Sequence, residues 1–174
     1  MTVERLDALL AQVIGQARDL SVPVSGSIDP HVRVNTRART RFGCCRREGG
    51  RYTVEVAAAL LEADESAVCR ILAHEVLHTC PGCANHGRRW KHWAGIMSNR
   101  FGYDIHRTDS HESLGLEDDR PVRWLVVCRS CGKTMPRMKR SALVEHPERY
   151  RCRCGGRLSV MTPAEYNEKE NSPD

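Results

Sequence analysis

Residues 72–93 read LAHEVLHTCPGCANHGRRWKHW, a stretch in which His-Glu-x-x-His is followed by a His-Gly pair. If the first eight of these residues are helical, His74 and His78 lie four positions apart on one face, and both imidazoles can reach one metal ion. Glu75 projects about 100° further around the helix. There its carboxylate can take a proton from water without serving as a ligand. The stretch therefore predicts a helix with two metal ligands and a general base.

The third ligand has to come from beyond this helix, because a catalytic zinc site uses three protein ligands and keeps one position open. His86 is the best candidate, since the Cys-Pro-Gly sequence at 80–82 ends the helix and lets the chain turn back. His92 is a weaker alternative, because six residues along a helix would point it away from His86. Zinc is the expected ion, because it commonly binds neutral imidazoles.

The nine cysteines occur mostly in closely spaced pairs, which in a reducing cytosol indicates metal ligands rather than disulfides. Two pairs, on glycine-bearing turns about 20 residues apart, consist of Cys128, Cys131, Cys152 and Cys154. Four thiolates would close the coordination sphere, so these residues predict a structural zinc ion in a zinc ribbon. For the cysteines at 44–45 and 80–83, three interpretations remain: free thiols, a redox pair, or a second metal site.

These motifs together resemble the SprT-like zinc metalloprotease family, of the SprT and Spartan type. The resemblance rests on HEVLH at 74–78, HGRRW at 86–90 and the C-terminal four-cysteine cluster, and it covers residues 24–160. It implies a zincin-like peptidase fold, and the characterised members of the family degrade proteins crosslinked to DNA. By match to the family motif, the zinc ligands would be His74, His78 and His86, and the catalytic base would be Glu75.

Apolar periodicity predicts an α+β fold in which residues 1–107 form the metallopeptidase domain, built from helices and a small antiparallel sheet. Residues 4–20 place apolar side chains at helical intervals, and residues 31–56 alternate apolar and polar side chains as strands do. The motif helix is expected to end near residue 79, and residues 87–101 carry Trp, Ala and Met at helical spacing. The edge of the sheet could pair with an extended peptide substrate.

The remainder of the chain predicts a linker, a second small domain and a tail. Residues 108–120 are acidic and polar without periodicity, which is typical of a linker. Residues 121–160 predict the zinc-ribbon domain, with strands at 122–127 and 149–154 that run into the cysteine turns. Residues 157–160 are expected to extend the second strand. The tail, residues 161–174, is mainly charged and polar and is expected to be disordered.

The net charge of +5 is concentrated in the predicted ribbon. Residues 1–120 contain 16 Lys and Arg against 16 Asp and Glu, whereas residues 121–160 contain 10 against 2. A basic module suits phosphate contacts, so DNA, including single-stranded DNA, is an expected partner. The expected nucleic-acid residues lie in the loop between the cysteine pairs: Arg137, Lys139 and Arg140. Trp124 and Tyr150 could stack on exposed bases.

Two classes of function fit these motifs. A zinc endopeptidase acting on a protein substrate, with DNA-associated or DNA-crosslinked proteins as the expected class, would use Glu75 as its base. The alternative is a non-catalytic nucleic-acid-binding protein whose zinc ions only hold the fold, but a closed structural site needs no carboxylate beside its metal. Tyr103, or an arginine near His86, is a candidate for stabilising the oxyanion.

The N-terminal sequence carries Glu4, Arg5 and Asp7 where a signal peptide would be apolar. No apolar run approaches the ~20 residues that span a bilayer. A cytoplasmic protein without a membrane partner is therefore expected, associated with the nucleoid if it binds DNA. The sequence does not nominate an oligomeric state.

Overall fold

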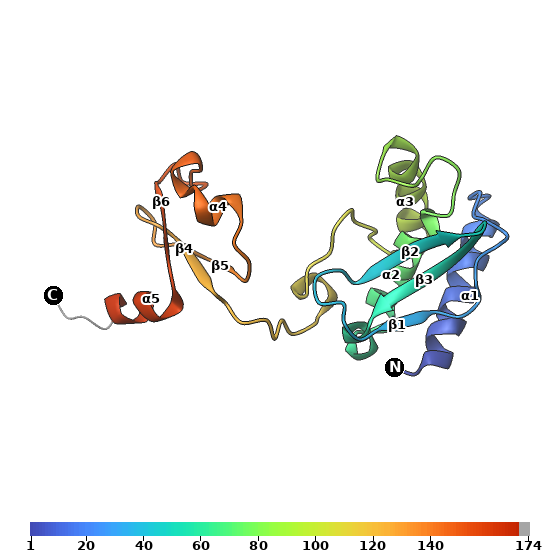
Figure 1. Cartoon of the computed structure of the whole chain (residues 1–174). Helices are drawn as coiled ribbons and strands as arrows, with labels where there is room; N and C mark the ends of the chain where they lie inside the picture. The colour runs from blue at the N-terminus through green and yellow to red at the C-terminus, as the bar shows by residue number, and fades with distance from the viewer. Residues whose placement is uncertain (171–174) are drawn as a thin grey trace. The chain divides into compact units, whose positions relative to one another are not determined.

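The computed structural model describes residues 1–170 and divides the chain into two compact units, Met1–Asp118 and Asp119–Asp174. The first unit contains α1 (Val3–Asp19), β1 (Arg33–Asn35), β2 (Gly43–Glu48), β3 (Arg51–Ala57), α2 (Glu65–Leu77) and α3 (Arg88–Phe101) (Figure 1). The second contains β4 (Trp124–Cys128), β5 (Thr134–Arg137), α4 (Ala142–Glu145), β6 (Leu158–Met161) and α5 (Pro163–Glu170). Short 3-10 turns occur at Ala58–Glu62, Glu112–Leu114 and Pro147–Arg149. The expected α+β fold is confirmed, and the second small sheet carries the four-cysteine cluster.

The first sheet has β3 at its centre, with β1 and β2 on either side. β2 and β3 form an antiparallel hairpin whose turn, Gly49-Gly50, requires the φ angles of 55° and 85° that glycine adopts freely. β1 pairs with β3 in parallel, so the sheet is mixed and the expectation of a purely antiparallel sheet is wrong. The reason is that residues 36–42 cross from one edge of the sheet to the other. β2 consequently lies at an edge.

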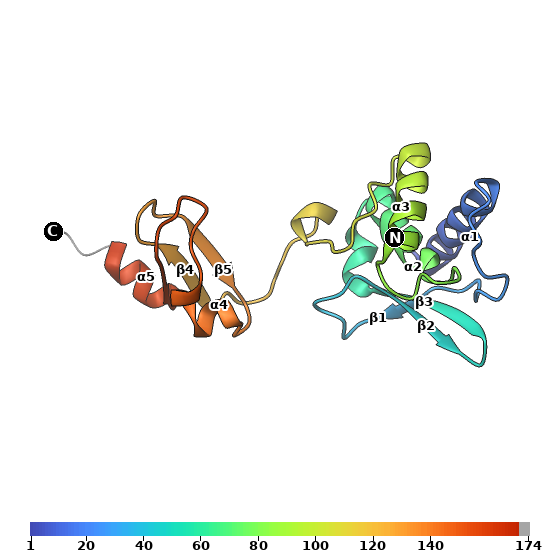
Figure 2. The ribbon, with the colours of Figure 1, turned by 90° about the horizontal axis from the view of Figure 1, so that it is seen from above.

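Three helices cover one face of this sheet (Figure 2). α1 buries an apolar stripe at helical spacing that consists of Leu6, Leu9, Leu10, Val13 and Ala17. This stripe shares one core with α2 and with the inward side chains of β3, Val54 and Val56. Each such leucine or valine contributes about 1.5–3 kcal/mol when it is fully buried. The core holds α2, the helix with the metal-binding motif, between the sheet and α3.

Residues 108–118 belong to the first unit, although their composition predicts part of a linker. The side chain of Leu114 is buried in the first core with 3% of its surface exposed. Asp109 forms an ion pair with Arg70 of α2 at 3.2 Å, and the two side chains are 3% and 18% exposed. Isolated contacts of this kind leave no periodic pattern in a sequence, which is why composition alone indicates a linker.

The second sheet is antiparallel, with the strand order β5-β4-β6. The first predicted strand, 122–127, corresponds to β4. The first part of the predicted return strand, 149–154, is wrong: Arg149 ends a 3-10 turn, Arg151 forms only an isolated β-bridge with Arg157, and the second cysteine turn follows. Gly155, with a φ of 84°, reverses the chain there, and the N–H of Cys152 donates to the carbonyl of Gly156 at 2.9 Å. The returning strand is β6, which corresponds to the predicted extension at 157–160.

The C-terminal segment begins with a helix, α5, where a disordered tail is expected. Thr162 and Glu165 cap its start reciprocally: the Thr162 N–H donates to the Glu165 carboxylate at 2.6 Å, and the Glu165 N–H donates to the Thr162 hydroxyl at 3.3 Å. Pro163 at the first helical position favours the same start. Residues 171–174 of the predicted tail lie outside the described residues. No helix within residues 1–170 is both long and apolar enough to cross a membrane.

Candidate active site

The centre of the site is α2, which is apolar around most of its circumference and is packed on both sides. His74 lies in its last full turn, and His78 caps its end. His86 follows in the loop before α3. One ligand atom from each of the three histidines lies within 4.8 Å of the other two. His92 is exposed on α3 and is not a member of this group, so the structure brings together the residues that the sequence favours.

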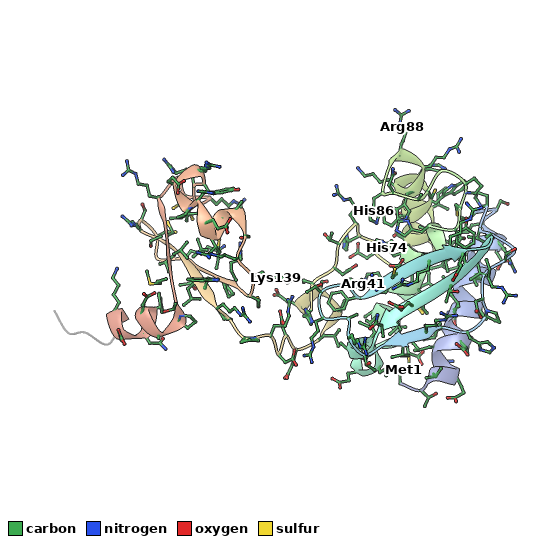
Figure 3. The ribbon with its side chains drawn as sticks, in the orientation of Figure 1. Met1, Arg41, His74, His86, Arg88 and Lys139 are labelled. Carbon is green, nitrogen blue, oxygen red and sulfur yellow. The ribbon has the colours of Figure 1, made fainter. Side chains whose placement is uncertain are left out.

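The three imidazoles have the spacing of a metal site. The Nε2 atoms of His74 and His86 lie 2.9 Å apart, and Figure 3 shows these two residues on one side of the first unit. Two nitrogens bound tetrahedrally to zinc would be about 3.3 Å apart, as follows from zinc–nitrogen distances near 2.0–2.1 Å. The ring of Trp90, only 2% exposed, supports all three imidazoles with centroid distances of 4.7, 5.9 and 4.6 Å.

Backbone carbonyls orient two of the histidines. The Nδ1 of His74 lies 2.8 Å from the carbonyl oxygen of His106, and the Nδ1 of His78 lies 2.7 Å from that of Cys83. A carbonyl oxygen only accepts, so both Nδ1 atoms carry the proton and donate it. Each Nε2 then keeps a lone pair for a metal ion, which is the arrangement that metal-binding histidines generally use.

The turn that supplies the Cys83 carbonyl explains why the chain returns to the site. Residues 80–83, Cys-Pro-Gly-Cys, form a β-turn in which the Cys83 N–H donates to the Cys80 carbonyl at 3.1 Å. Proline at the second position and Gly82 at the third, with a φ of 74°, are the residues that a type II turn prefers. The turn thus ends the α2 region and brings His86 back to the two helix-borne histidines.

The imidazoles are held in the neutral form that binds metals. Burial lowers the pKa of His74 to about 4. Burial also lowers the pKa of His86, and the nearby charges of His78 and Arg107 act in the same direction. Both rings are therefore uncharged at neutral pH and available as ligands.

Glu75 is nearly buried, with 6% of its surface exposed, and lies against the edge strand β2. Burial raises the pKa of its carboxyl group to about 7, although the N–H of Cys45 donates to it and Arg41 attracts its negative charge. The closest approach is at Gly43, where a Cβ atom would lie 2.5 Å from the Glu75 Oε1 and 2.8 Å from the Ile71 Cγ2. Only glycine leaves room for the carboxylate at this position.

A small cavity of about 180 Å³ opens beside His74 and Glu75. Residues 40–43, which lead into β2, form one side of it, and residues 107–109 form the other. We call residues 106–109 the wall segment, because they also supply the carbonyl that orients His74. No sequence pattern indicates the wall segment, because its contacts with α2 join residues more than 30 positions apart.

The sequence model of the SprT-like family matches residues 16–111, from α1 through the wall segment. The chain belongs to the SprT-like family. A comparison with curated proteins returned no match. The matched region of this SprT-like chain contains the three histidines, Glu75 and both sides of the cavity. The second unit with its cysteines follows the matched region.

The second unit carries the other group of possible metal ligands in this SprT-like protein, consisting of Cys128, Cys131, Cys152 and Cys154. Their Sγ atoms are 3.5 Å apart between Cys128 and Cys154 and 3.7 Å between Cys131 and Cys152. Tetrahedral zinc–sulfur bonds near 2.3 Å imply about 3.8 Å between sulfurs. Backbone N–H groups of Cys131 and Ser130 lower the pKa of Cys128 to about 6, which favours the thiolate. The cluster therefore fits a structural metal ion.

The remaining cysteines of the SprT-like domain do not form a third metal group within the described residues. Cys80 and Cys83 are buried neighbours, and burial raises the pKa of Cys80 to about 12. Burial likewise raises the pKa of Cys45, on β2, to about 12. These thiols stay protonated at neutral pH, which supports the interpretation as unreactive thiols.

Two further predicted residues can be placed. The hydroxyl of Tyr103 donates to the side chain of Gln16 on α1 and is buried there, so it does not face the histidines. An arginine near His86 does exist, namely Arg107 of the wall segment. Neither helical nor strand periodicity could have found Arg107, because it lies between the helix predicted at 87–101 and the linker predicted from residue 108, outside both.

The predicted nucleic-acid residues lie on the second unit at the end of β5 and in the following loop. Lys139 is exposed (Figure 3). The guanidinium of Arg140 lies over the ring of Trp124 at 5.9 Å and 3.9 Å from the carboxylate of Glu145. Arg137 donates to the carbonyl of Pro136. Sequence reasoning missed three other arginines that border a cavity of about 440 Å³ in the same unit, Arg129, Arg151 and Arg157.

Proposed function

We propose that the chain is a zinc-dependent metalloendopeptidase. One observation carries the proposal: the side chains of three histidines converge on one point, and Glu75 is buried beside them. Glu75 is not one of the ligands, and it lies on the helix that carries His74. Burying a carboxylate costs free energy of folding unless it is paired or hydrogen-bonded, so a buried glutamate beside three histidines indicates a functional role. A structural metal site closes with four ligands, as the cysteine cluster can, and gains nothing from a neighbouring acid. The observation therefore favours a peptidase over a non-catalytic nucleic-acid-binding protein.

The residues present fit a zinc ion, because each of the three imidazoles brings one ring nitrogen to the same place, and the Nδ1 bonds of His74 and His78 leave their Nε2 atoms available to bind. When bound, zinc would lower the pKa of water towards neutrality and polarise the substrate carbonyl. Glu75 accepts the proton of the attacking water on its carboxylate and then donates it to the nitrogen of the leaving amine. The N–H of Cys45 keeps that carboxylate in position during both transfers.

The edge strand β2 is suited to hold the substrate in an extended form. It pairs with β3 on one side only, and its Gly43 approaches Glu75 closely. An extended peptide could add to this edge by backbone hydrogen bonds, which bind without regard to sequence. The scissile bond would then lie over Glu75 and the histidines.

The decisive experiment is Glu75→Gln, which keeps the size of the side chain but removes its basicity. We expect bound zinc to be unchanged and cleavage of an unstructured protein to fall by at least ~100-fold. Glu62→Gln, an exposed glutamate on a 3-10 turn, is the matched control and should keep full activity. If the zinc-loaded wild-type protein cleaves nothing, the peptidase proposal fails; if Glu75→Gln cleaves normally, the base is another group.

We further propose that the second unit contacts nucleic acid and brings the peptidase to DNA-associated or DNA-crosslinked proteins. Its ten Lys and Arg against two Asp and Glu between 121 and 160 support this proposal. The candidate contacts are Arg137, Lys139 and Arg140, with Arg129, Arg151 and Arg157 as a second set on the same unit. The ring of Tyr150, 40% exposed, is available for stacking on a base.

A further inference from the structure

The cavity beside Glu75 has an apolar inner part and a cationic outer part. Ile71, Phe42 and Glu75 line it and are nearly or fully buried, whereas Arg41 and Arg107 line it and are exposed. We call it the Arg41–Arg107 pocket. With a volume of about 180 Å³ it is the size of one amino-acid side chain rather than of a larger ligand.

The two arginines retain free positive charge. Within the described residues Arg107 forms no hydrogen bond or ion pair. Its positive charge is close enough to lower the pKa of His86. Arg41 donates to Glu55 at 2.8 Å, but Glu55 is shared with Arg46 at 3.5 Å, so one acid faces two guanidinium groups. A guanidinium has five N–H donors, and the bond to Glu55 uses only part of those of Arg41.

The acids in the lining do not cancel this charge. Asp109 is bound to the guanidinium of Arg70 at 3.2 Å and accepts from the hydroxyl of Ser113 at 3.3 Å. Its side chain is only 3% exposed. Glu75 lies at the buried end of the pocket, where Arg41 attracts its carboxylate, and it is a single acid against two exposed arginines. The open end is therefore positive.

The proton transfer proposed for Glu75 indicates which residue of the substrate lies next to this pocket. Glu75 has to donate its proton to the leaving amine, so the residue that provides this amine lies beside Glu75. The pocket is bordered by Glu75 and therefore receives the side chain of that residue. Resting on the proposed peptidase function, we propose that the Arg41–Arg107 pocket binds a glutamate side chain on the residue directly after the scissile bond.

Glutamate fits better than aspartate because of its length. Its two methylene groups can contact Ile71 and Phe42, and its carboxylate then reaches the arginines while staying away from Glu75. A carboxylate can also come from the C-terminus of a peptide. The experiment separates these two sources by comparing free and amidated peptide ends.

The test uses zinc-loaded full-length protein and one cleavable peptide made with Glu, Asp, Gln or Lys after the scissile bond, each prepared with an amidated and with a free C-terminus. We expect kcat/KM for Glu to exceed that for Gln by about tenfold, which corresponds to about 1.4 kcal/mol. Arg107→Glu should reverse the preference in favour of Lys, and Arg41→Gln should reduce it. Arg18→Gln, which removes an equal charge at an exposed position on α1 that does not line the pocket, should leave the ratio unchanged.

Binding gives a readout that does not depend on turnover. Titration of the Glu75→Gln variant with the Glu and Gln peptides should give the same order of affinity, measured by fluorescence anisotropy. Equal kcat/KM for Glu and Gln in a protein that cleaves both would overturn the pocket assignment but keep the peptidase. A preference seen only with free C-termini would assign the pocket to chain ends. If nothing is cleaved, the peptidase fails, and equal affinities in the titration would overturn the pocket as well.

Discussion

His86 and His92 are six residues apart, yet only one of them meets the helix-borne histidines. His86 follows the turn at 80–83 and lies 2.9 Å from His74, whereas His92 is exposed on α3 beside Trp93. We expect the wild-type protein to contain about two zinc ions per chain, His86→Ala about one, and His92→Ala again two, as measured by elemental analysis. If His92→Ala lost one zinc ion and His86→Ala kept both, His92 rather than His86 would be the third ligand.

Sequence spacing predicted the side chains of this site that lie on one helix and missed those brought in by the fold. His74, Glu75 and His78 follow from the i, i+4 geometry of a helix. His86 could be favoured because a Pro-Gly turn precedes it. Arg107 could not be predicted, because its position beside His86 depends on the wall segment packing against α2.

The approach of β2 to α2 is the element contact on which the site depends most closely. Gly43→Ala would place a Cβ atom 2.5 Å from the Glu75 Oε1, so the strand or the carboxylate must move. We expect the free energy of unfolding to fall by ~1–3 kcal/mol, as in overpacked cores. Peptidase activity should fall at least ~10-fold, because a 1 Å misplacement of a catalytic group can cost even more. Zinc content should not change, because no ligand lies on β2.

The matched control is Gly95→Ala on α3, where a Cβ atom would meet nothing within 4 Å. This change should raise stability by up to ~1 kcal/mol, since alanine is the better helix former. For both variants, urea unfolding measures the free energy of unfolding and cleavage of a peptide measures the activity. Full activity in Gly43→Ala would mean that β2 can retreat from Glu75 without consequence.

Elements were predictable where the pattern was local. The α1 stripe and the glycine hairpin turn are visible in the sequence, and both are present in the structure. The parallel pairing of β1 was not predictable, because it depends on where residues 36–42 cross the sheet. α5 did carry a signal, the Thr162 and Glu165 capping pair, which the charged composition of the segment obscured.

At the scale of the whole molecule, the chain has two separate cores, and each of the two metal groups belongs to one of them. The succession of an SprT-like domain and a cysteine-bearing small sheet was predictable, because histidine and cysteine motifs are local in sequence. The extent of the first unit was not, since residues 108–118 join it through single contacts such as Leu114.

The charge of the second unit leads to a prediction about nucleic acid. Affinity for single-stranded DNA should fall with salt, with a log-log slope of about −0.7 per neutralised phosphate. Replacing Arg137, Lys139 and Arg140 by glutamine should flatten this slope by about two units and leave zinc content unchanged. The same replacement of Arg129, Arg151 and Arg157 removes equal charge from another part of the unit. If one of the two triple variants keeps the wild-type salt dependence, the three residues replaced in it do not contact phosphates.

The wall segment determines where a shortened form of the protein can end. A boundary at residue 107, which composition suggests, would remove Asp109 and leave the Arg70 guanidinium buried without its carboxylate, a loss of about 3–5 kcal/mol. It would also take away Leu114 and one side of the cavity. An isolated SprT-like domain therefore has to retain the acidic stretch through Asp118. Proteolytic trimming within that stretch would therefore disrupt the site while leaving His74, His78, His86 and Glu75 in place.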